Sequence, residues 1–199
     1  MATAPNILPV VTPADQVNGP PQGRWTYKAY SQLPEDEHRY ELIEGVLYMA
    51  PAPTTDHQGA NALFITHLMI HVQFAGLGRV LGPPCDVELA PNIVVQPDVI
   101  VVLDEHIEII TPSHIVGAPD LIVEIASPST AGYDRRNKQD TYARAGVREY
   151  WIADPATRTI EVHVLVEESY RSLGVFQGKA TLPSSIVPGL PVPVQRFFV

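Results

Sequence analysis

The pattern of hydrophobic and polar positions along the chain predicts a series of strands. Two apolar runs, residues 94–103 and 120–127, have the length and the Val and Ile content of strands buried on both faces. Residues 41–49 alternate around Glu44-Gly45, which predicts a tight hairpin. Shorter apolar segments predict further strands at 78–82 and 85–90.

Other stretches have the spacing of helices. Between about residues 55 and 74 apolar positions recur near a period of 3.6, and Gly76 follows as a stop signal. Thr26 could cap a short helix that runs to about Leu33. A further helix is predicted to start at an N-cap Asp134 and to run through Ala145, with Gly146 at the C′ position.

The order of these elements predicts a mixed α/β fold. Residues 149–166 read as a second hairpin, with its turn at residues 154–157. The last thirty residues contain four prolines and are expected to wrap the core. Helices and strands in this order favour one central mixed sheet flanked by helices. Residues 1–23, with five prolines and no periodicity, predict a flexible arm before a single domain at 24–199.

Composition narrows the class of protein. The chain has 199 residues, of which 45% are hydrophobic and 18% charged, as in ordinary globular domains. Its single cysteine, Cys85, excludes an internal disulfide framework and a Cys-rich zinc site. No stretch reaches the 18 or more apolar residues of a membrane span, and no signal peptide is evident. The expected location is therefore the cytoplasm.

The charge distribution bears on nucleic-acid binding. A net charge of −9 argues against general affinity for phosphate backbones. Residues 134–158, however, carry six basic and four acidic side chains, so this segment is +2 and the rest of the chain is −11. A solvated helix face would explain this segment as well as a binding surface does.

Two carboxylates interrupt the most hydrophobic runs. Asp98 lies in 94–103 and Glu124 in 120–127, where an ionised side chain costs several kcal/mol unless a cation or strong donors compensate it. Facing residues on neighbouring strands can approach within about 5 Å, so these two could share a divalent metal ion. Asp120 would stand about 13 Å along the strand from Glu124, and we interpret it as a turn or strand-entry residue. The alternative is that both serve as buried, hydrogen-bonded structural carboxylates.

The sequence resembles a known family. The ordered blocks are YELIEGVLYMAP, QPDVIVV, APDLIVEIASPST and DRRNKQDTYARAGVREYWIADP, between about Trp25 and Val166. They are similar to the Uma2 family (DUF820), described as restriction endonucleases of the PD-(D/E)xK nuclease superfamily. The resemblance implies a restriction endonuclease-like α/β fold, with a central mixed β-sheet flanked by helices.

The resemblance also implies roles for individual residues. Asp98 corresponds to the aspartate of the PD motif and Glu124 to the acidic residue of (D/E)xK. The lysine of that motif is missing, because Ala126 stands two residues after Glu124. Lys138 on the following helix is the candidate replacement, on the same helical face as Asp134 and Tyr142. Alternatively, Lys138 pairs with Asp134 at the surface.

Further residues complete the site that the resemblance implies. Glu41 would be the glutamate that adds to the metal site, with Glu44 in the predicted turn as its competitor. The backbone carbonyl of Ile125 would be another metal ligand. His57 resembles a histidine near the family's cleft, although a histidine at a helix start can equally be a surface residue.

Two hypotheses about function follow. The first is an Mg²⁺-dependent endonuclease acting on DNA, with Mn²⁺ as a substitute and a homodimer as the expected assembly. Its candidate phosphate contacts are Arg135, Arg136 and Arg144, with His57 beside them. The second is a non-catalytic module that keeps a nuclease fold and binds nucleic acid or a protein.

Overall fold

The computed structural model describes residues 11–34, 36, 38–126 and 134–198, and the side chains of all of these except residues 134–137. Within that part of the chain two six-stranded sheets are present, where the sequence predicts one. The run 94–103 explains the difference, because it is divided between a strand of each sheet, with Pro97 at the division. Proline has no backbone N–H to continue a ladder, so the strand breaks there.

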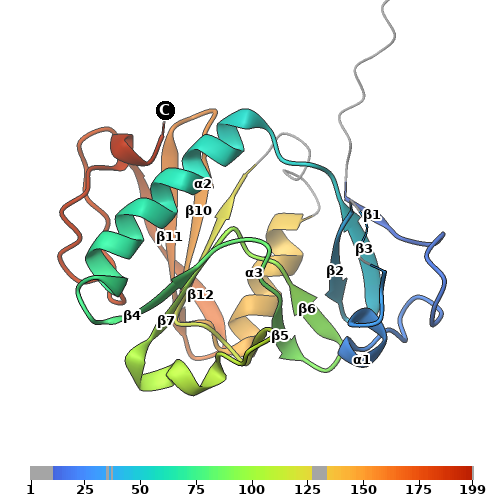
Figure 1. The fold of residues 1–199 in the computed structure, drawn as a ribbon. Helices are drawn as coiled ribbons and strands as arrows, with labels where there is room; N and C mark the ends of the chain where they lie inside the picture. The colour runs from blue at the N-terminus through green and yellow to red at the C-terminus, as the bar shows by residue number, and fades with distance from the viewer. Residues whose placement is uncertain (1–10, 35, 37, 127–133, 199) are drawn as a thin grey trace, which may run out of the picture.

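The central sheet has the strand order β12-β11-β10-β9-β7-β4 (Figure 1). Its strands are β4 (Gly78–Leu81), β7 (Val99–Leu103), β9 (Leu121–Ile125), β10 (Glu149–Asp154), β11 (Thr159–Val166) and β12 (Ser169–Gln177). The pair β9–β10 is parallel and the other pairs are antiparallel. The sheet is therefore mixed, as predicted.

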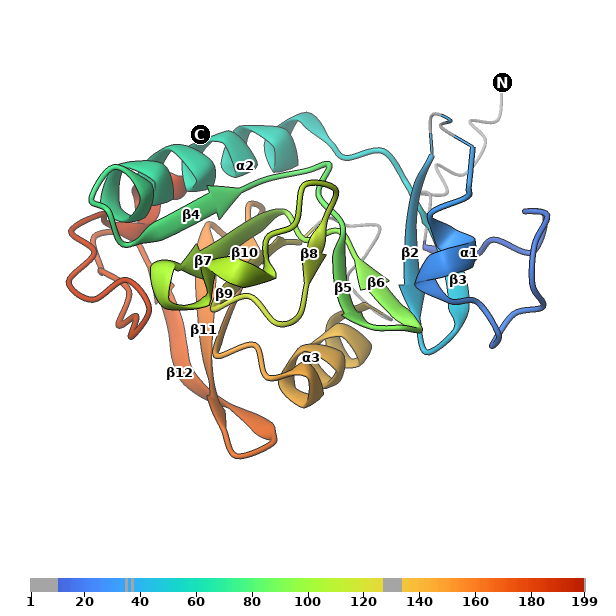
Figure 2. The same ribbon diagram turned by 60° about the horizontal axis from the view of Figure 1, so that its bottom comes forward.

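Helices lie on opposite faces of this sheet (Figure 2). On one face α2 (Thr55–Leu68) continues into a π-helical turn (Met69–Gln73), and its Phe64 and Leu68 pack in one core with Trp151 of β10. On the other face α3 (Asp134–Ala145) places Tyr142 in a second core with Tyr150. The fold class predicted from the sequence is confirmed: a central mixed sheet flanked by helices.

The second sheet has the order β1-β3-β2-β6-β5-β8 and carries the first hairpin. Its strands are β1 (Thr12–Pro13), β2 (Arg39–Ile43), β3 (Val46–Ala50), β5 (Val87–Ala90), β6 (Ile93–Val95) and β8 (Ile115–Val116). The turn between β2 and β3 has positive φ at Glu44 (51°) and Gly45 (78°), as type I′ hairpin turns require. Trp25 and Leu42 lie in the third core, beneath the short helix α1 (Tyr27–Tyr30).

Several local predictions agree with the structure. Gly146 ends α3 with φ of 91°, and the N–H groups of Gly146 and Val147 both donate to the carbonyl of Tyr142. The helix itself begins at Asp134, whose side chain lies outside the described residues. Thr26 precedes α1 without a side-chain capping bond, and the helix ends at Tyr30 rather than Leu33.

The C-terminal prediction is only partly right. The last thirty residues include most of β12, a nine-residue edge strand that the proline content did not indicate. After it the chain crosses the α2 face, and the 3-10 helix Val194–Phe197 packs Phe197 against Phe64 with ring centroids 4.4 Å apart. A second 3-10 helix, Asp104–Ile109, follows β7.

The division into an arm at 1–23 and a domain at 24–199 stays a prediction. Of the arm, the described residues begin at 11; Thr12 and Pro13 pair with Met49 and Tyr48 of β3, and Ala14 is buried. No helix in the described ranges is long and apolar enough to cross a membrane.

Candidate active site

Asp98 lies where the chain passes from one sheet to the other. It precedes β7 instead of lying within a strand, which corrects the sequence prediction. The residue is 2% exposed, and Oδ2 accepts a hydrogen bond from the backbone N–H of Ile125 at 2.8 Å and contacts His57 Nε2 at 3.1 Å. Oδ1 is buried with no hydrogen-bond partner among the described residues; the guanidinium of Arg39 lies 3.6 Å away.

Glu124 occupies the strand next to Asp98. The register pairs Val99 of β7 with Val123 of β9, so Asp98 and Glu124 are the next positions across the pair, as the sequence predicts. The hydroxyl of Tyr142 donates to Glu124 Oε1 at 2.6 Å, and Lys138 Nζ lies 3.4 Å from the same oxygen. Both partners come from α3, so this helix fixes the Glu124 carboxylate.

Glu41 reaches the same place from the second sheet. Its carboxylate is buried, and Oε1 accepts hydrogen bonds from the backbone N–H of Gln96 and from Lys138 Nζ, each at 3.0 Å. Its competitor Glu44 is 59% exposed in the hairpin turn and pairs with Arg144 at 2.7 Å. The structure thus brings Glu41, and not Glu44, to Lys138.

Lys138 is buried rather than at the surface. Its side chain is 7% exposed, and Nζ lies within 3.4 Å of carboxylate oxygens of both Glu41 and Glu124. The ammonium therefore bridges two acidic residues that come from different sheets.

Arg39 is a site residue that the sequence analysis missed. It lies two residues before Glu41 on β2, and its guanidinium also donates a hydrogen bond to the carbonyl of Gln96. Burial would lower the pKa of Arg39, but the charges of Glu41, Asp98 and Glu124 outweigh it and hold the pKa above its usual value. The alternation of Arg39 with Glu41 on one strand face was the signal that could have revealed it.

Asp98 stays ionised in spite of its burial. Withdrawal from water raises its pKa, but the hydrogen bond and charge of His57, the charge of Arg39 and the Ile125 N–H outweigh it. The net effect is a pKa below the ordinary value. A carboxylate held charged beneath the surface, with one oxygen unsatisfied, is suited to bind a cation.

The donor set fits a hard divalent ion. Three carboxylates, Glu41, Asp98 and Glu124, face two cationic side chains, Lys138 and Arg39, so the formal balance is negative. In a β-strand, the backbone N–H and C=O of one residue point toward the same neighbouring strand. The N–H of Ile125 points toward Asp98, so the carbonyl of Ile125 lies on the side of Asp98 too. Oxygen ligands of this kind are those that Mg²⁺ and Mn²⁺ prefer.

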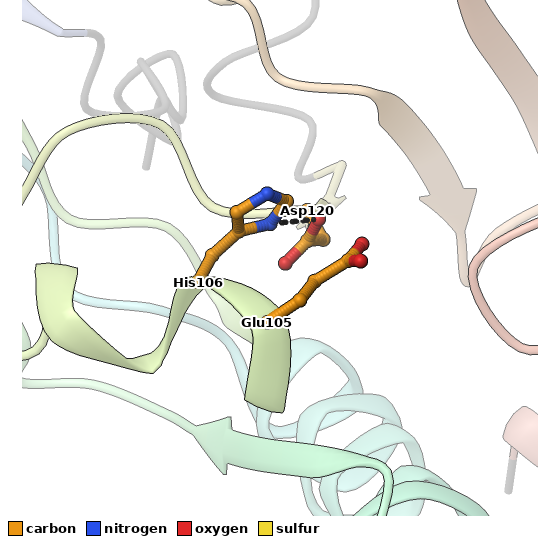
Figure 3. A group of neighbouring side chains, drawn as sticks. All are labelled: Glu105, His106 and Asp120. Atoms are coloured by element: carbon orange, nitrogen blue, oxygen red, sulfur yellow. Dashed lines mark hydrogen bonds and ion pairs between the residues drawn. The ribbon is translucent and has the colours of Figure 1, made fainter.

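A second acidic cluster has its metal-ligating atoms closer together than the predicted site does. Within the described ranges, the one group of three metal-ligating side chains with all ligand atoms within 4.8 Å of one another is Glu105, His106 and Asp120 (Figure 3). The carboxylates of the predicted site are not gathered so closely. In the cluster, Asp120 Oδ1 bonds to His106 and to Arg148, each at 2.9 Å, and Oδ2 accepts the N–H of Leu103.

Arg148 also pairs with Glu105 at 2.8 Å, so a cation already lies in this cluster. Asp120 is 1% exposed and is held by a backbone N–H and two side chains. This is the arrangement of a structural carboxylate at a strand entry, in agreement with the interpretation from the sequence.

The candidate nucleic-acid contacts are spread around α3. Arg144 is 59% exposed and pairs with Glu44, which ties the last turn of the helix to the first hairpin. The side chains of Arg135 and Arg136, in the first turn, lie outside the described residues. His57 is buried at the start of α2 against Asp98, so it belongs to the carboxylate site rather than to an exposed phosphate-binding face.

Comparison with known proteins identifies the family and the fold. The family model Uma2, described as "Putative restriction endonuclease", matches residues 27–195. The crystal structure of a "putative nuclease belonging to DUF820" from Anabaena variabilis is similar, with a TM-score of 0.72 and 22% sequence identity over 87% of this chain and 97% of that chain. No functionally curated protein matches. The chain belongs to the Uma2 family and has the fold of that DUF820 protein.

Proposed function

We propose that this protein is a metal-dependent endonuclease that hydrolyses DNA phosphodiester bonds, with Mg²⁺ as the ion and Mn²⁺ as a substitute. One observation carries the proposal: the buried ammonium of Lys138 lies within 3.4 Å of carboxylate oxygens of both Glu41 and Glu124. Asp98, which directly precedes the neighbouring strand β7, has a carboxylate oxygen without a hydrogen-bond partner in the described part of the chain. Acidic oxygens beside a buried lysine supply the two things that phosphodiester hydrolysis needs, metal ligands and a fixed positive charge.

Each residue has a defined part in this proposal. Glu41, Asp98, Glu124 and the carbonyl of Ile125 would hold the ion, and a bound ion would supply acidification of a water molecule and neutralisation of charge on the phosphoryl oxygens. Lys138 orients the attacking water or stabilises the pentavalent transition state. Tyr142 and His57 fix Glu124 and Asp98 by the contacts described above. Arg135, Arg136 and Arg144 contact the phosphate backbone and position the substrate.

A non-catalytic binding module is the second candidate. Lys138 and Arg39 already compensate much of the negative charge of the three carboxylates, so the site can persist without a divalent ion. The net charge of −9 also favours a protein that does not hold DNA broadly. In this case the fold binds nucleic acid or a protein without cleaving it.

Cleavage of plasmid and oligonucleotide DNA in Mg²⁺, Mn²⁺ and EDTA separates the two candidates. The nuclease proposal expects ion-dependent cleavage by wild type and loss of it in Asp98→Ala and Lys138→Ala. The matched controls are Asp104→Ala and Lys179→Ala, which remove an exposed carboxylate and an exposed ammonium outside the site. If wild type and Asp98→Ala behave alike in both metals, the nuclease proposal is wrong.

The expected assembly and location belong to the same proposal. A homodimer would allow both strands of a duplex to be cut, and sedimentation of the purified protein measures this directly. A cytoplasmic location would give the enzyme access to DNA, and cell fractionation tests it.

A further inference from the structure

A cleft of about 570 Å³ lies against Asp98, and its lining includes no described residue of α3. The start of α2 provides His57, Asn61 and Ala62, and the chain near β2 provides Arg39. The size is in the range of sites that bind small organic groups. Because Asp98 is part of its lining, whatever occupies this cleft lies beside the proposed site of hydrolysis.

Four unsatisfied polar atoms belong to the lining of this one cleft. They are Arg39 Nε, His57 Nδ1, Asn61 Oδ1 and Asp98 Oδ1, all buried and without a hydrogen-bond partner in the described part of the chain. Each buried, unpaired polar group costs about 1–3 kcal/mol. Several such groups in side chains that border one cleft indicate that a small rotation of these side chains toward a ligand would supply the missing partners.

The charge of the lining argues against a phosphate as the ligand. The basic side chains of the lining are already paired with its two carboxylates: Arg39 and His57 with Asp98, and His38 with Asp36. An anion would find no unpaired cation there. The ligand is therefore an uncharged group with both donors and acceptors, since the unpaired atoms include both kinds.

Part of the remaining lining is apolar. Pro53, Pro83 and Pro84 are exposed at the cleft, and Ile65 lies beside them. Apolar walls next to amide side chains are the surroundings in which an unstacked nucleobase is held: its faces contact the walls and its edge pairs with the polar groups. Gln58 and Gln96 add two further amides to the lining.

We propose that this cleft is a nucleobase subsite, which binds an unpaired base next to the phosphodiester that is cut. The inference rests on the proposed nuclease function and adds to it the form of the substrate. A base can enter the cleft only when it is out of the double helix, so the preferred substrate is single-stranded or locally opened. Asn61 reads the edge of the base, and His57 links the base to Asp98 through its hydrogen bond.

Binding of a single-stranded oligonucleotide and of an otherwise identical one carrying abasic sites tests the subsite. Both have the same phosphates, so a difference in Kd reports the bases alone. Measured by fluorescence anisotropy with Ca²⁺ in place of Mg²⁺, the wild type should bind the base-containing strand about tenfold more tightly, as one stacked base would give. Asn61→Leu should remove the preference and leave the Kd for the abasic strand unchanged.

Asn92→Leu is the matched control, since it removes an exposed amide in a turn outside the cleft, and it should keep the preference. Asn61→Leu should melt at the wild-type temperature or above, because Asn61 Oδ1 has no partner to lose. Should Asn61→Leu fail to fold, Ala62→Trp decides instead. Ala62 is exposed on α2 in the lining, so the indole fills the cleft without disturbing the buried groups.

The outcomes separate the subsite from the nuclease. Equal binding of the two strands by wild type, no binding of either, or a preference that survives both cleft variants overturns the subsite, whether or not DNA is cleaved. A preference that Asn61→Leu abolishes supports it. If that result comes without Mg²⁺-dependent cleavage, the nuclease proposal fails and the base-binding cleft belongs to a binding module.

Discussion

Lys138 Nζ lies 2.9 Å from Oε2 of Glu41, and both side chains are almost completely withdrawn from solvent. The two residues are 97 positions apart in the sequence. The same ammonium lies 3.4 Å from Glu124, so one cation joins α3 to the first hairpin and to the central sheet. Because a buried charge without a partner is costly, the three side chains depend on one another.

Replacing Lys138 should therefore destabilise the protein. Lys138→Met leaves Glu41 and Glu124 without their shared cation, and we expect the free energy of unfolding to fall by about 3–5 kcal/mol in EDTA. Urea unfolding followed by circular dichroism measures this. Adding Glu41→Gln to the variant should recover part of the loss, because it removes one unpaired charge. Lys179→Met, at an exposed position, should change stability by less than about 0.5 kcal/mol. A Lys138→Met variant as stable as wild type would contradict the buried bridge.

Arg39 should not be replaceable by lysine. Its guanidinium faces Asp98 Oδ1 at 3.6 Å and donates to the carbonyl of Gln96, and a single ammonium cannot reproduce this fork. For the proposed nuclease we expect Arg39→Lys to lower the rate of Mg²⁺-dependent cleavage at least about tenfold, a change of about 1.4 kcal/mol in the barrier. Rates at saturating Mg²⁺ measure this, with the exposed Arg171→Lys as control. Cleavage within twofold of wild type would show that Arg39 is only a counter-charge.

The cluster at Asp120 should behave as a structural element. Arg148→Met removes the guanidinium that pairs with the buried Asp120, and the expected loss is about 2–3 kcal/mol, less than for a fully buried pair because Arg148 is 48% exposed. Arg144→Met is the matched comparison. Both members of the Arg144–Glu44 pair are 59% exposed, so its loss should be under about 1 kcal/mol. Chemical unfolding of both variants gives the two values. Equal losses, or the absence of cleavage in an otherwise folded Arg148→Met, would be inconsistent with a structural role.

Three tyrosines withdrawn from solvent, two of them buried and Tyr170 partly buried, should make stability fall in alkali. Burial raises the pKa of Tyr30, Tyr142 and Tyr170 above the ordinary value of 10.0, with the charges of Asp86 at Tyr30 and Glu124 at Tyr142 adding to the effect. Below pH 10 their contribution to stability is complete. As the pH rises above 10, the unfolded chain releases protons that the folded chain keeps, so stability is lost by about 1.4 kcal/mol per pH unit for each tyrosine.

Tyr170→Phe offers the cleanest test of this pH dependence, because Tyr170 lies on β12 and its hydroxyl donates a hydrogen bond to the carbonyl of Val147 rather than to a charged side chain. Urea unfolding between pH 9 and 11 should show a shallower decline for the variant than for wild type. Parallel declines would mean that Tyr170 ionises in the folded protein as readily as in the unfolded chain.

Much of the local structure follows from the order of residues. The hairpin around Glu44-Gly45 forms because these positions accept positive φ, and α3 ends where Gly146 does. The neighbouring positions of Asp98 and Glu124 also follow, since two buried runs of strand length have few ways to pair in one sheet. The family's motif pointed to Lys138 as well, although no local pattern could show which carboxylates it meets.

What the sequence by itself determined is thus the local elements, the family resemblance and a pair of facing carboxylates, because period, turn chemistry and burial act over a few residues. Only the tertiary structure decided that the strands form two sheets, that Arg39 joins the site, and that Glu41 rather than Glu44 meets Lys138. It also decided that His57 and Asn61 line a cleft beside Asp98. These contacts join segments tens of residues apart. Their geometry depends on how the sheets and helices pack as whole bodies, which no local periodicity encodes.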